Sequence, residues 1–149
     1  RRMSDDTAQR TEPTGTTTGS PQRQPEVLAA PVLAFDLIAE LERLRGEDAY
    51  ERGERNARTL VHEPDFRIVL IALKKGGKLE EHRAPARISI HALDGRLQVR
   101  VPLEVVELPA GRLLALEADI PHEVEALEEG AFLLTIGWHG GRPARSQGE

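Results

Sequence analysis

The feature that most constrains the fold is a series of short segments, from residue 57 onward, in which apolar and polar residues alternate. This period of two is typical of β-strands, because successive side chains point to opposite faces of a sheet. Pro, Gly and Asp interrupt the series at short intervals, and no helical pattern lies between the segments. The segments are RTLVH, FRIVLIALK, RISIHAL, RLQVRV, EVVEL, RLLALEA, HEVEAL and FLLTIGW. Strands that follow one another without crossover helices predict an all-β, antiparallel sandwich or barrel.

Two turns are predicted within this series. The pair Asp94-Gly95 stands between RISIHAL and RLQVRV. Glycine accepts a positive φ without a Cβ clash, so the pair predicts a tight hairpin. The charged stretch EALEEG precedes FLLTIGW and is expected to be a solvated turn that leads into the last strand.

Ahead of the strands, the stretch VLAFDLIAELERLRG has helical periodicity. An apolar stripe recurs at helical spacing and is broadened by Ile38; its leucines are Leu33, Leu37, Leu41 and Leu44. Pro31 precedes the stretch and Gly46 can cap its end. One N-terminal amphipathic helix is therefore expected over residues 31–46, with its stripe packed against the main domain or against a second subunit.

The two ends of the chain differ from the rest in composition. Residues 1–30 are rich in Thr, Gly, Pro, Ser and Gln, and such a segment cannot bury enough surface to offset the entropy of ordering it. We expect a disordered tail there and a flexible C-terminal tail over residues 140–149. The strands between residues 56 and 139 then form one barrel domain, which suits a chain of 149 residues.

Charge and composition exclude several kinds of partner. Lys and Arg number 20 against 25 Asp and Glu, so the chain has no excess of positive charge to bind a phosphate backbone. Aromatic residues make up only 3%, too few to stack with nucleic-acid bases. Cysteine is absent, which excludes disulfides, a thiolate nucleophile and Cys-ligated zinc. No apolar run approaches the roughly 18–20 residues that span a bilayer. We expect a cytoplasmic protein with neither nucleic-acid nor membrane partners.

Two segments of the chain carry a resemblance to a known family. In the first, five residues separate Gly76 from His82, and Gly95 follows; in the second, LPAGRLLALEADIPHEVEAL, Gly111 precedes His122. In spacing and order these segments resemble the two motifs of a small single-domain bacterial cupin. The resemblance covers residues 56–138 and implies a cupin-type, RmlC-like antiparallel jelly-roll β-barrel. Because cupins often dimerise through the barrel, it also implies a homodimer.

The resemblance implies a metal site made of His-x-His and a Glu or Gln from the first motif and one His from the second. His82 and His122 occupy the first and last of these positions, but Ala84 and Ile88 stand at the other two and cannot coordinate a metal. If His82 faces the cavity, Ala84 should face it too, because alternate residues of a strand share a face. We therefore expect no metal cofactor.

A divalent metal, if one binds, would be held by His82 and His122. Catalytic metal sites generally use three or more protein ligands. The candidates for a third ligand are Glu80, His62 and His139.

The same alternation predicts which residues line a ligand cavity. Ile88 and Ile90 share the inward face of RISIHAL, and Val124 shares a face with His122 in HEVEAL. The surroundings of the two histidines are thus mainly apolar. The predicted ligand-binding residues are His82, His122, Ile88, Ile90 and Val124.

These observations favour a small-molecule-binding barrel in which two histidines anchor the ligand. An enzyme is the first alternative, either a metal-dependent oxygenase or isomerase with atypical ligands or a metal-free acid–base isomerase, since imidazole titrates near neutral pH. A structural or regulatory dimer module is the second. The chain has no Gly-rich phosphate loop, G-x-S-x-G or HExxH motif, so the residues leave catalysis and the catalytic groups open.

Overall fold

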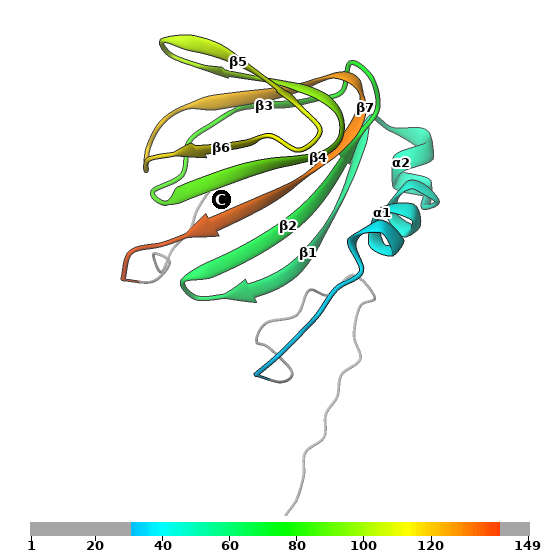
Figure 1. Cartoon of the computed structure of the whole chain (residues 1–149), viewed down its shortest axis with the longest axis horizontal. Coiled ribbons are helices and arrows are strands. Elements are labelled where there is room, and N and C mark those ends of the chain that lie inside the picture. Colours follow the sequence, from blue (N-terminus) through cyan, green and yellow to red (C-terminus); the bar gives the residue numbers. More distant parts are fainter. Residues whose placement is uncertain (1–30, 141–149) are drawn as a thin grey trace, which may run out of the picture.

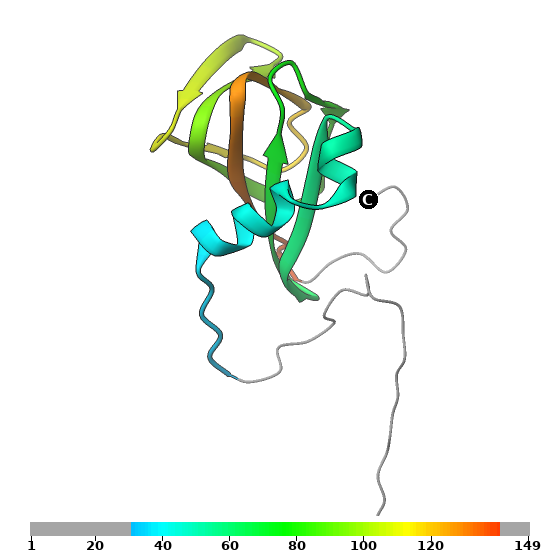
Figure 2. The same ribbon diagram turned by 90° about the vertical axis from the view of Figure 1, so that its right-hand side faces the viewer.

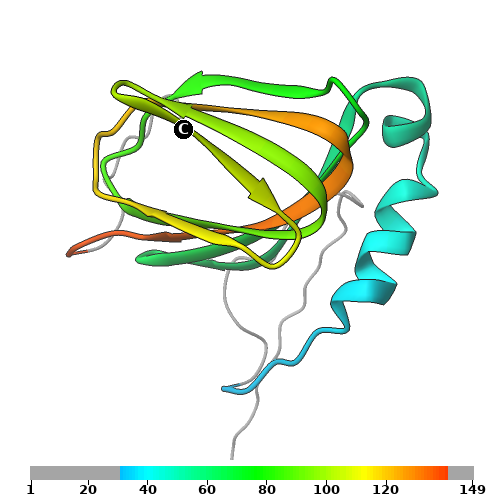
Figure 3. The same ribbon diagram turned by 45° about the horizontal axis from the view of Figure 1, so that its top comes forward.

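The structure is a computed structural model that describes residues 31–140, and its strands form one strongly curved antiparallel sheet (Figure 1). The strands are β1 (Arg55–Glu63), β2 (Phe66–Leu73), β3 (Lys78–His82), β4 (Arg87–Val101), β5 (Glu104–Pro109), β6 (Leu113–Leu116) and β7 (His122–Gly137). Their order is β1-β2-β7-β4-β5, with β3 paired to β7 and β6 paired to β4. The sheet curls around one interior (Figure 3), which confirms the predicted antiparallel barrel. The tail predicted over residues 1–30 lies outside the described residues, and so does the tail predicted over residues 140–149 except for its first residue.

The two predicted turns are not turns. Residues 94–95 lie inside β4, and the stretch EALEEG lies inside β7. The two strands pair on both sides of a shared bend, where the register shifts between Ala92 and Leu97. Gly95 has a φ of +76°, and a Cβ added to it would stand 2.2 Å from the backbone oxygen of Glu129. Glycine therefore allows one long strand to bend closely over another here, as at the corner of a barrel.

Two helices lie on the outside of the sheet, over β1 and β2 (Figure 2). Helix α1 (Leu37–Arg45) begins later than predicted because the Asp36 side chain caps it, accepting a hydrogen bond from the Ala39 N–H at 3.1 Å. A short helix α2 (Asp48–Arg52) follows and was not predicted from the sequence. In the part of the chain that the structure describes, no helix has the length and apolar character needed to cross a membrane.

The buried residues form two clusters, one on each face of the sheet. The cluster inside the barrel contains Leu73, Ile90, Leu97, Val99, Val124 and Phe132, among others. The cluster outside lies between the helices and the sheet and contains Leu44, Tyr50, Leu60, Val61, Leu70 and Ala72, with Leu37 and Leu41 packed against them. Alternate residues of β2 thus serve the two clusters in turn.

The apolar stripe of α1 therefore finds its partner surface in its own subunit. Leu44 is only 1% exposed, and Leu37 and Leu41 pack beside it. Ile38 does not belong to this packed face, since 73% of its surface is exposed, and Leu33 precedes the helix. The helical periodicity was right, but the stripe is narrower than predicted.

Candidate functional site

An irregularity in the pairing of β3 with β7 brings the two motif histidines together. Leu79 pairs with Val124, and His82 pairs with His122. Two residues separate Leu79 from His82 on β3, whereas one residue separates Val124 from His122 on β7. The extra residue of this bulge restores the phase, so that Leu79 and His82 face the same side although they are three positions apart.

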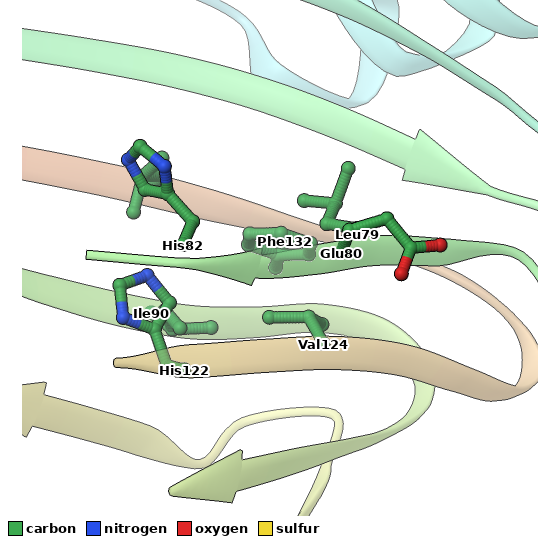
Figure 4. Close-up of a pocket in the computed structure, with 8 residues that line it drawn as sticks. Leu79, Glu80, His82, Ile90, His122, Val124 and Phe132 are labelled. Atoms are coloured by element: carbon green, nitrogen blue, oxygen red, sulfur yellow. The ribbon is translucent and has the colours of Figure 1, made fainter. Parts of the chain in front are cut away.

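These side chains line a cavity of about 260 Å³ between β3, β4 and β7 (Figure 4). Its walls are almost entirely apolar, and the imidazoles of His82 and His122 lie together at one end. The lining residues are Leu79, Glu80, His82, Ile90, His122, Val124, Phe132 and Leu134. An apolar hollow with a few polar groups at one end is the usual form of a small-molecule site.

The two imidazoles are neighbours with perpendicular rings. Their centroids are 5.7 Å apart and the planes meet at 88°. His122 Nδ1 lies 2.8 Å from the backbone oxygen of Ile120. A carbonyl oxygen only accepts hydrogen bonds, so Nδ1 carries the proton and donates it. In neutral His122, Nε2 is then left with a free lone pair.

Burial lowers the pKa of His122 below its ordinary value, because the charged imidazolium is costly to desolvate. The hydrogen bond to Ile120 opposes this decrease, and the nearby His82 adds to it. His122 is half-buried, whereas His82 is more exposed. At neutral pH the site therefore presents His122 as a neutral group that accepts a hydrogen bond.

Four of the five predicted ligand-binding residues line the cavity. They are His82, His122, Ile90 and Val124. Ile88 is the exception: it faces the barrel interior as predicted, but it pairs with Leu116 and Ile136 and is buried among core side chains. Ile88 thus points inward as predicted, but it is not among the residues that line this cavity.

Ala84 does not share the cavity with His82. Strand β3 ends at His82, and Ala84 lies in the connection to β4, where its carbonyl accepts a hydrogen bond from the Asp119 N–H at 2.8 Å. Strict alternation fails here because the strand stops. The Asp119 contact also links the segment after His82 to the turn before His122.

The candidates for a third metal ligand are dispersed. Glu80 lines the cavity, but its carboxylate points away from both imidazoles (Figure 4). His62 lies in β1, with Nε2 3.1 Å from an Arg67 nitrogen, and His139 is exposed beyond the end of β7. Across residues 31–140 no three His, Cys, Asp or Glu side chains form a group that could hold a metal. The residues of this cavity do not fit the metal that the family resemblance implies.

Three residues of the cavity wall were not predicted from the sequence, namely Leu79, Phe132 and Leu134. Leu134 could have been found, because it pairs with Ile90 across β4 and β7, and the two alternating patterns allow that register. Leu79 could not, since its direction depends on the bulge. Phe132 is 1% exposed and serves both the core and the cavity.

Comparison with known proteins gave matches to solved structures only. No family model matches the chain, and no curated protein matches it. A cupin superfamily protein from Desulfitobacterium hafniense is 14% identical over 58% of this chain and 80% of its own, with a TM-score of 0.57. A conserved protein of unknown function from Streptococcus pyogenes is 21% identical over 78% of this chain and 96% of its own, with a TM-score of 0.59.

A third structure, a cupin 2 conserved barrel domain protein from Leptotrichia buccalis, is 26% identical over 65% of this chain and 45% of its own, with a TM-score of 0.58. RmlC-like cupins from two further bacteria match as well. The chain therefore has the fold of a small cupin jelly-roll domain, as the resemblance of its two motifs implied.

Proposed function

We propose that this cupin domain binds a small organic molecule in the cavity between β3, β4 and β7, without a resident metal. One observation carries the proposal: the cavity has apolar walls and two imidazoles at one end. Apolar walls supply binding energy in proportion to the ligand surface removed from water. The imidazoles fix the orientation of the ligand by hydrogen bonding.

The chemistry of the two substituted positions supports the metal-free part of the proposal. Ala84 has no donor atom and lies outside the cavity, and Ile88 places a hydrocarbon in the core. First-row metals are held tightly when several protein side chains share the coordination sphere, and structural sites generally use four ligands. With only His82 and His122, we expect weak metal affinity and loss of metal on purification.

Metal-free acid–base catalysis is a second candidate function, and the state of His122 favours it. Its Nδ1 proton is held by Ile120, so Nε2 can take a proton from a bound molecule, in the manner of a general base. The test is proton exchange in D2O on a small ketone such as phenylacetone. Exchange next to the carbonyl that is lost in His122→Ala would establish this chemistry, and unchanged exchange would exclude it.

The binding proposal is tested by two measurements on untagged protein. Elemental analysis is expected to give far less than one metal per chain, and near-stoichiometric iron, manganese, nickel or zinc would overturn the metal-free part. In an NMR titration with ethylbenzene, amide resonances of β3 and β7 residues around the cavity are expected to shift. Resonances of α1 on the outside of the barrel serve as the internal control. No shift around the cavity would overturn the binding part.

A further inference from the structure

The polar end of the cavity accepts one particular pattern of hydrogen bonds. His122 has a single proton when neutral, and that proton is already donated to the backbone oxygen of Ile120 at 2.8 Å. The remaining nitrogen, Nε2, can only accept. A ligand atom that meets His122 must therefore bring its own proton. A carboxylate has no proton to donate, so the lone pairs of its oxygen and of Nε2 would repel each other.

The charges around the cavity point the same way. Among the described side chains that line it, none is Lys or Arg, and Glu80 is the one charged residue. An anionic ligand would thus lose its hydration without gaining a counter-charge, which is costly in an apolar site. A cation would be attracted by Glu80, but that carboxylate is exposed and points away from the histidines, so the attraction is screened by water.

The neighbouring imidazole completes the pattern. The His82 ring lies 5.7 Å from that of His122, centroid to centroid, and an imidazole always has at least one N–H that can donate a hydrogen bond. A hydroxyl group both donates and accepts. It can donate to His122 Nε2 while it accepts from His82, which neither a carboxylate nor an ammonium ion can do.

We infer that the ligand of this cavity is an uncharged, mainly apolar molecule that carries a hydroxyl group at one end. This inference rests on the proposed binding function and adds the chemical class of the ligand. A cavity of about 260 Å³ has room for about ten non-hydrogen atoms, if an engineered cavity of about 150 Å³ that holds benzene sets the scale. The hydroxyl lies between the histidines, and the apolar body contacts Ile90, Val124 and Phe132.

The experiment is an NMR titration at pH 7.5 with four probes that share one aromatic body. They are ethylbenzene, 2-phenylethanol, 2-phenylethylamine and phenylacetate, so that only the end group changes. A neutral hydrogen bond corresponds to about a two- to twelvefold gain in affinity. We expect 2-phenylethanol to bind tighter than ethylbenzene by that factor, and at least about tenfold tighter than phenylacetate because of the desolvation of the carboxylate.

Two variants locate the effect. In His122→Ala the advantage of the alcohol over ethylbenzene is expected to disappear, while ethylbenzene itself still binds. His91→Ala is the matched control, because His91 is a half-buried histidine on β4 that does not line the cavity; there the preference for the alcohol should persist. The comparison of the four probes on the native protein decides the inference even if one variant fails to fold.

Each remaining outcome is decisive. Tighter binding of phenylacetate or of 2-phenylethylamine than of 2-phenylethanol would overturn the hydroxyl inference and assign the cavity to a charged ligand. Equal binding of all four probes would overturn it as well, while the proposed binding function stands. If none of the four shifts the resonances around the cavity, the proposed function itself fails.

Discussion

At the shared bend of β4 and β7, the close approach of the two strands allows the effect of replacing its two glycines on the free energy of unfolding to be predicted. Gly95 has a positive φ of 76°, and a Cβ there would stand 2.2 Å from the Glu129 oxygen. At Gly130 the φ is not positive, but a Cβ would stand 2.4 Å from the Asp94 oxygen. Gly111 is the matched third site, because its φ is +96° and no atom lies within 4 Å of the added Cβ. Gly95→Ala thus tests the clash and the backbone conformation together. Gly130→Ala tests the clash alone, and Gly111→Ala tests the backbone conformation alone.

The expected losses of unfolding free energy follow from three contributions. A left-handed conformation costs an L-residue about 1–2 kcal/mol, and a steric clash that shifts the backbone costs about 1–3 kcal/mol. Against these, Gly→Ala stabilises by about 0.4–1 kcal/mol through the unfolded chain. With mid-range values, Gly111→Ala should lose about 1 kcal/mol, Gly130→Ala about 1 kcal/mol and Gly95→Ala about 3 kcal/mol.

The assay is urea denaturation of all three variants, followed by far-UV circular dichroism. A loss near 3 kcal/mol is large against the total of about 5–15 kcal/mol that single domains have, so the midpoint for Gly95→Ala should fall clearly below the other two. Equal midpoints for Gly95→Ala and Gly111→Ala would refute the reasoning, since the close approach of β4 and β7 would then cost nothing.

Three further predictions concern the histidine, the helix and the assembly. Because burial lowers the pKa of His122 below 6.5, the unfolded chain binds more protons just below that pH. The stability from neutral His122 is therefore fully present above pH 6.5 and lost as pH falls towards the folded pKa; urea midpoints between pH 5 and 8 should show this dependence, and His122→Gln should weaken it. Leu44→Ala should cost about 2–5 kcal/mol, whereas Ile38→Ala, on the exposed side of α1, should stay within about 0.5 kcal/mol; equal thermal shifts would contradict the packing described for α1. A homodimer is still predicted from the resemblance, and light scattering that gives the monomer mass at micromolar concentration would contradict it.

The sequence by itself determined the architecture and the identity of the central residues. Alternation over residues 87–92 and 122–126 specified the inward faces of β4 and β7, because the pleat of a strand leaves only two directions for a side chain. The resemblance of two segments to the cupin motifs singled out His82 and His122 as a pair, and in the structure their ring centroids lie 5.7 Å apart. The sequence also excluded two ligands of the metal site that the resemblance implies, since the side chains of Ala84 and Ile88 have no atoms that coordinate a metal.

Tertiary structure decided where strands end, bend and shift against one another. The pair Asp94-Gly95 has the same local chemistry in a hairpin and in a barrel corner, and only the long pairing of β4 with β7 selects the corner. Ala84 lies outside the cavity because β3 stops at His82, and Leu79 lines the cavity because a bulge precedes His82. Local alternation specifies the side of a strand on which a residue lies. Whether a strand contains a bulge, and so has one residue more than its neighbour over the same length, is decided only when the two strands pair.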